Sequence, residues 1–140
     1  MDAEFDDALI DWERFAQART QLGPNFWRVM GYLREDGHKA VGTIENALRA
    51  KDAAALVGPS ELLKTEAEQM GAIAVAEIAE VIEIQSRECV EWRQSPEFLL
   101  EDVVRLRTTF ERTVARLEQE ASPLLERKAA MRRSIELAVR

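Results

Sequence analysis

Apolar residues recur along most of this chain at spacings of three and four, which place them on one face of an α-helix. The clearest stripe lies in the last long segment, which the pattern predicts to be a helix over about residues 97–120. Its apolar positions alternate between the two spacings, and they are Leu99, Val103, Leu106, Phe110, Val114 and Leu117. Such a seam is suited to packing in a bundle. No segment alternates as a β-strand would, so an all-α fold is expected.

Glycine and proline mark the expected ends of the earlier helices. The first predicted helix spans about residues 2–21 and is ended by Gly23 and Pro24. The second spans about residues 25–48 as one long helix, because the apolar register is the same on both sides of Gly37.

A break is expected next at Gly58 and Pro59, after a short helical stretch over residues 51–57. Proline is tolerated in the first turn of a helix, so Pro59 can restart one that runs to about residue 70. Gly71 suits the left-handed position that ends a helix. A further helix is predicted over about residues 73–93.

The chain therefore divides into a helical bundle over residues 1–121 and a basic amphipathic tail over residues 122–140. Ser122 and Pro123 are expected to start a short tail helix. The modest apolar side of that helix consists of Met131, Ile135 and Val139.

Composition narrows the class of protein. The 140 residues are 46% hydrophobic and 32% charged, which is typical of a globular protein, and the net charge is -7. An acidic surface repels phosphates and anionic lipids, so neither nucleic acid nor a membrane is expected as a partner. No apolar run reaches about 20 residues, and the start lacks the basic and apolar regions of a signal peptide. We expect a cytoplasmic protein.

Few residues offer independent chemistry. His38 is the only histidine and is expected to be a solvated helix residue, while Cys89, the only cysteine, lies on an apolar stripe and should pack in the core. Trp12, Trp27 and Trp92 are expected to pack between helices. The sequence has no phosphate-binding glycine loop and no metal-binding or catalytic-triad pattern, so no cofactor, metal or independent enzyme is expected.

The most informative segment is residues 59–72. Leu63, Ala67 and Met70 fall together on the inward side of its predicted helix. Glu61 lies about 200° from Leu63 around the helix axis and therefore points outward. The remaining outward positions are Lys64, Thr65, Glu68 and Gln69.

This segment resembles the signature of histidine-phosphotransfer (HPt) domains. Leu63, Lys64, Ala67, Gly71 and Ala72 match that signature in register. Residues 18–23 and 32–37 resemble the entry helices of alphaproteobacterial members, and residues 78–83 resemble the helix that packs behind the site. The similarity covers about residues 5–120. The resemblance implies an antiparallel four-helix bundle, here with an additional N-terminal helix and the short C-terminal tail helix. It also implies a structural role for Leu63, Ala67 and Gly71.

The main departure is Glu61, which stands where the family has its phosphorylated histidine. A histidine nitrogen is nucleophilic near neutral pH, whereas phosphorylation of a carboxylate would give a mixed anhydride and the anion would repel the donor. We therefore expect a degenerate HPt protein that does not carry phosphate. It would bind the receiver domain of a response regulator, or a hybrid histidine kinase, through Glu61, Lys64, Thr65, Glu68 and Gln69.

Several alternatives stay open from the sequence. Glu61 could mimic the phosphorylated histidine, or form with Lys64 a surface ion pair that contributes about 0–1 kcal/mol. His38 could serve as another phosphate acceptor, which would make the protein competent in a relay. The bundle could instead be structural and associate with itself through its tail or its first helix.

Overall fold

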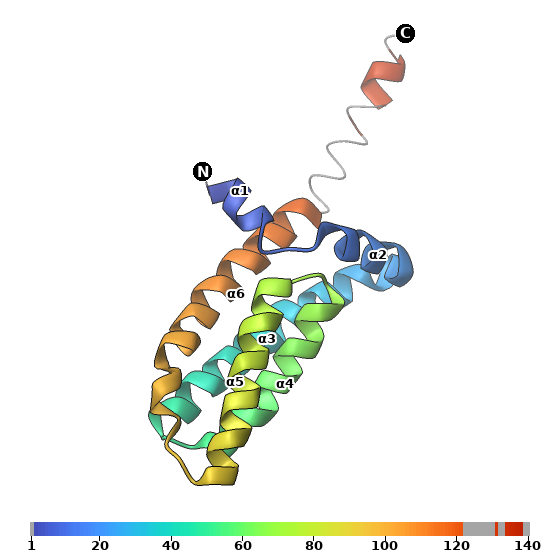
Figure 1. Ribbon diagram of the computed structural model, residues 1–140. Helices are drawn as coiled ribbons and strands as arrows, with labels where there is room; N and C mark the ends of the chain where they lie inside the picture. Colours follow the sequence, from blue (N-terminus) through green and yellow to red (C-terminus); the bar gives the residue numbers. More distant parts are fainter. Residues whose placement is uncertain (1, 122–130, 132–133, 139–140) are drawn as a thin grey trace.

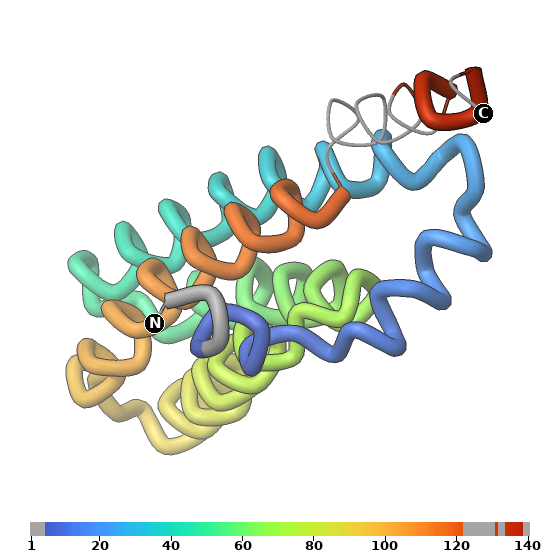
Figure 2. Tube along the Cα trace, turned by 90° about the horizontal axis from the view of Figure 1, so that it is seen from above, coloured from blue at the N-terminus to red at the C-terminus, as the bar shows by residue number. Residues whose placement is uncertain are grey.

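The computed structural model describes residues 2–121, 131 and 134–138. The helices are α1 (Asp2–Asp7), α2 (Trp12–Leu22), α3 (Phe26–Arg49), α4 (Ala53–Gln69), α5 (Ile73–Trp92) and α6 (Leu100–Ala121), with 3₁₀ turns at Gly23–Asn25 and Pro96–Leu99. The four long helices α3 to α6 form an antiparallel bundle in which α4 and α5 pair closely and α6 lies between α5 and α3 (Figures 1 and 2). The predicted all-α four-helix bundle is confirmed. Among the described helices, none is long and apolar enough to cross a bilayer.

The N-terminal region differs from the single helix predicted over residues 2–21. It is two helices, because Asp11 takes an extended conformation and caps α2, its side chain accepting a 3.1 Å hydrogen bond from the Arg14 amide. The amide of Asp11 donates instead to the carbonyl of Gly71, at 2.8 Å. The helical spacing of apolar residues across this break misled the prediction, and Phe5 in α1 is exposed.

The expected interruption at Gly58 and Pro59 is also wrong, since α4 continues through both residues. Asp52 caps the helix at its start, accepting a hydrogen bond from the Ala55 amide at 3.1 Å. The residue before a proline usually avoids the helical region because its Cβ meets the proline ring, and Gly58 has no Cβ. A single helix therefore carries both the apolar residue Leu56 and the informative segment that follows.

The prediction of one long second helix is confirmed, and Gly37 lies inside α3. A Cβ added to Gly37 would lie 2.5 Å from Cε2 of Phe110 on α6. The glycine thus makes room for an aromatic ring from the facing helix, and it does not bend the chain.

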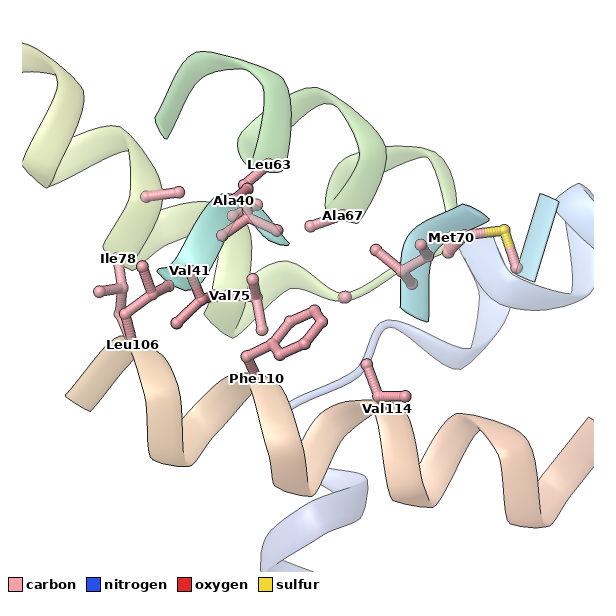
Figure 3. Close-up of a cluster of buried hydrophobic side chains, with 14 of the residues drawn as sticks. Ala40, Val41, Leu63, Ala67, Met70, Val75, Ile78, Leu106, Phe110 and Val114 are labelled. Carbon is pink, nitrogen blue, oxygen red and sulfur yellow. The ribbon is translucent and has the colours of Figure 1, made fainter. Parts of the chain in front are cut away.

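The core of the bundle is formed by the inward sides of all four long helices (Figure 3). Leu63 and Ala67 of α4 are fully buried, and Figure 3 shows them directed toward the interior where Phe110 lies. Cys89 is buried, as predicted, and burial raises the pKa of its thiol.

The tryptophans depart from the expectation of inter-helix packing. Trp12 does pack between helices, because its ring lies 4.9 Å from the Arg116 guanidinium of α6 and it is partly buried against the core. Trp27 is partly exposed, and Trp92, at the end of α5, is 68% exposed. In the predicted tail, Ser122, Pro123 and Val139 lie outside the described residues, and the described Met131 and Ile135 are exposed.

Candidate functional site

Helix α4 presents two different faces, as the sequence predicted. Leu63, Ala67 and Met70 are fully buried, while Glu61 and Thr65 are exposed on the opposite side. Glu68 and Gln69 are exposed as well, and Lys64 is half-buried. The five residues predicted to bind a partner therefore share the accessible side of one helix; we refer to them, with Arg87 of α5, as the α4 face.

Glu61 forms an ion pair across the α4–α5 contact. Its Oε2 accepts a hydrogen bond from Nη2 of Arg87 at 3.3 Å, and Arg87 also pairs with Glu83 of its own helix at 3.0 Å. The side chains of Glu61 and Arg87 are both more than half exposed, so solvent can reach the pair.

The ion pair between Glu61 and Lys64 that was considered from the sequence is not formed. Lys64 pairs with Glu80 of α5 at 3.5 Å. Residues three apart on a helix can meet, but here each finds a partner on the neighbouring helix. The hydroxyl of Thr65 donates to the carbonyl of Glu61 at 3.1 Å and so stays within α4.

The surface formed by α4 and α5 is strongly acidic. These two helices hold eight glutamates against one lysine and one arginine, a net charge of -6 out of -7 for the chain. Six large apolar side chains are exposed on the same two helices, namely Leu62, Ile73, Val81, Ile84, Val90 and Trp92. Apolar side chains among polar ones are common where one protein docks on another.

Gly71 has the structural role that was expected, and a second one that the sequence did not indicate. Its φ of +81° is the left-handed conformation that lets the chain turn after α4. A Cβ at this position would also lie 2.5 Å from the carbonyl oxygen of Asp11. Gly71 thus brings the segment before α2 against the α4–α5 turn.

The resulting cleft between α2 and α4, of about 460 Å³, was missed by sequence reasoning. Thr65, Glu68 and Gln69 form one wall. The other wall comes from α2, and Nε of Arg14 donates across the cleft to the main-chain carbonyl of Glu68 at 2.9 Å. The cleft depends on the contact between Asp11 and Gly71, and no local sequence pattern predicts a contact between residues so far apart.

Two further candidate groups lie outside the α4 face, namely His38 on α3 and the half-buried Glu66 on α4. His38 is exposed on α3. Burial, and to a lesser extent the charge of Asp36, raises the pKa of Glu66, whose Oε2 has no hydrogen-bond partner in the part of the chain described. Among these described residues, no group of three or more His, Cys, Asp or Glu side chains is placed to hold a metal ion.

Comparisons with known proteins bear on the fold. No protein-family model matches the sequence, and no curated protein is significantly similar to it. In structure, the chain is similar to histidine-containing phosphotransfer protein B (HptB) of Pseudomonas aeruginosa PAO1, with a TM-score of 0.71 and 18% sequence identity. The similarity covers 81% of this chain and 95% of HptB. The chain therefore has the fold of a histidine-containing phosphotransfer protein.

Proposed function

We propose that this chain is a degenerate phosphotransfer protein that binds the receiver domain of a response regulator, or a hybrid histidine kinase, without carrying phosphate. In this proposal the bundle of residues 1–121 acts in the cytoplasm as a decoy, scaffold or brake in a two-component phosphorelay. The tail of residues 122–140 is a separate element. Phosphotransfer proteins of this kind carry a phosphoryl group rather than act as independent catalysts, and this one would lack even that capacity.

The observation that carries the proposal is Glu61, exposed on the α4 face of an HPt-like bundle. Support comes from the inward residues Leu63 and Ala67 and the turn residue Gly71, which match the HPt signature in sequence and are respectively buried and in a left-handed turn. What has changed is the chemistry at one outward position, where a carboxylate replaces an imidazole.

The ion pair with Arg87 argues against phosphate mimicry by Glu61. A phosphorylated side chain carries a charge of about -1.5 to -2, whereas the single charge of Glu61 is partly balanced by Arg87 at 3.3 Å. We therefore propose that Glu61 does not imitate a phosphorylated histidine, and that the α4 face resembles that of an unphosphorylated HPt protein.

The test is binding and phosphoryl transfer with a panel of receiver domains from the same cell. The wild-type chain and Glu61→His should bind the same receivers, and only Glu61→His should take up label from a phosphorylated receiver. Glu88→His, which adds a histidine on the exposed side of α5, is the matched control and should stay unlabelled.

Two outcomes would contradict the proposal. If no receiver or kinase of the panel binds either variant, the α4 face is not a docking site of this class. If the wild-type chain is labelled and His38→Ala abolishes the label, the protein is a competent relay carrier with an unexpected acceptor.

A further inference from the structure

The cleft between α2 and α4 is rich in side-chain amides. Its α2 wall consists of Arg14, Gln17, Ala18, Gln21 and Leu22, facing Thr65, Glu68 and Gln69. Its volume of about 460 Å³ lies within the range of about 300–1,000 Å³ found for ligand pockets.

The three glutamine side chains have no hydrogen-bond partner within the described part of the chain, and all three are exposed. A primary amide offers both donors and an acceptor. A peptide backbone offers the same combination at each residue, so an extended segment can satisfy several of these amides at once.

The charges in the cleft favour a neutral ligand. Arg14 and Glu68 are the only ionisable side chains among the residues that line it, and they offset each other. The net charge of -6 on α4 and α5 would repel an anionic segment, and a cationic one would find in the lining a single carboxylate, Glu68, that Arg14 already offsets.

The cleft is also held in shape before anything binds. The Arg14–Glu68 hydrogen bond joins its two walls, and Phe15 is buried against Phe26 with 5.6 Å between ring centroids. A site that needs no ordering loses less entropy on binding.

We propose that this cleft binds an extended, uncharged peptide segment of the partner that docks on the α4 face. The inference rests on the proposed function, since Thr65, Glu68 and Gln69 belong to both surfaces. Glu61 and Gln69 are separated by about 12 Å along α4, so a typical footprint of about 800 Å² reaches both.

The experiment selects short linear peptides from a displayed library on the full chain. Enriched peptides should be uncharged and should shift the side-chain NH₂ resonances of Gln17, Gln21 and Gln69 in ¹⁵N–¹H spectra. The double variant Gln17→Ala/Gln21→Ala should weaken their binding at least about tenfold, or about 1.4 kcal/mol. Gln94→Ala, an exposed glutamine beyond the end of α5, should leave binding unchanged.

The inference is overturned if no peptide is enriched, or if the enriched peptides bind the double variant as well as the wild type. Both replacements are on the exposed side of a helix and should leave the unfolding temperature unchanged, which separates loss of a ligand from loss of the fold. No receiver domain is used, so a negative result here leaves the Glu61→His test of the docking face unaffected.

Discussion

Two of the arginine–glutamate pairs that join neighbouring helices of this bundle are built differently. Arg107 of α6 holds Glu45 of α3 with two hydrogen bonds of 2.6 and 2.8 Å, and both side chains are about three-quarters buried. Arg87 of α5 reaches Glu61 of α4 with one bond of 3.3 Å, and both side chains are more than half exposed. The first geometry is that of a structural contact, whereas the second leaves both groups accessible to a partner.

The same contrast extends to the surroundings of each pair. One turn along α6 from Arg107, the ring of Phe110 fills the space left by Gly37. Around Arg87 the neighbours are the exposed Glu61, Glu83, whose side chain is largely covered, and exposed apolar side chains such as Ile84. Substitutions at the α3–α6 contact should therefore lower the stability of the fold, whereas most substitutions on the α4–α5 surface should leave it nearly unchanged.

The largest expected effect comes from adding a branched side chain at the α3–α6 contact. Gly37→Val should lower the free energy of unfolding by about 3 kcal/mol, because the new atoms overlap Phe110 in the core. Gly31→Val on the same helix is the matched control, since nothing lies within 4 Å of a Cβ added there. Denaturant unfolding measures both; equal losses in the two variants would mean that helix propensity, not packing, controls the result.

The two ion pairs can be compared directly by truncation. Arg107→Ala should cost about 1.5 kcal/mol, because it removes the two charge-assisted hydrogen bonds to Glu45 in a partly buried site, together with an exposed one to Glu111. Arg87→Ala should cost less than about 0.5 kcal/mol. Chemical denaturation of both variants under the same conditions gives the comparison, and a larger loss for Arg87→Ala would reverse our assignment of roles.

The structural pair should also appear in the pH dependence of stability. Hydrogen bonds from Arg107 hold the pKa of Glu45 below its ordinary value of 4.5. The stabilisation is therefore present above that value and is lost as the pH falls through the lower pKa of the folded state. The difference in unfolding free energy between wild type and Glu45→Gln should shrink as the pH is lowered toward about 3. A difference that stays constant would show that ionisation of Glu45 is not involved.

The smallest effect is expected at Glu66, where the sign is opposite. Because its pKa is raised, the wild type gains stability from neutral Glu66 at low pH and loses it as the pH rises through the raised pKa. Glu66→Gln, which is always neutral, should be more stable than wild type near neutral pH, by about 0.5 kcal/mol or less after screening by solvent. The gain should vanish at acidic pH in thermal unfolding; Glu68→Gln, on the exposed side, should show no such gain.

Features that depend on local helical periodicity could be predicted from the sequence, whereas features that depend on contacts between distant residues could not. The burial of Leu63 and Ala67 and the exposure of Glu61 depend on helical periodicity alone, and they were correct. The partner of Glu61 depends on a helix 26 residues away, and the sequence reasoning considered Lys64 instead. The break before α2 was missed because it requires Asp11 to bond to Gly71, a contact that periodicity does not encode. Pro59 led to the wrong prediction of a helix break, because the steric effect of a proline on the preceding residue is small when that residue is a glycine.

The bond between Asp11 and Gly71 has a consequence for the order of folding. Helices α4 and α5 are adjacent in sequence, so their pairing closes a short loop and should form early. The contact of Asp11 with Gly71 closes a loop of roughly sixty residues, whose entropy must be overcome later. The candidate docking face around Glu61 should therefore exist in partly folded chains that lack the α2–α4 cleft, and hydrogen exchange at α2 should be faster than at α5.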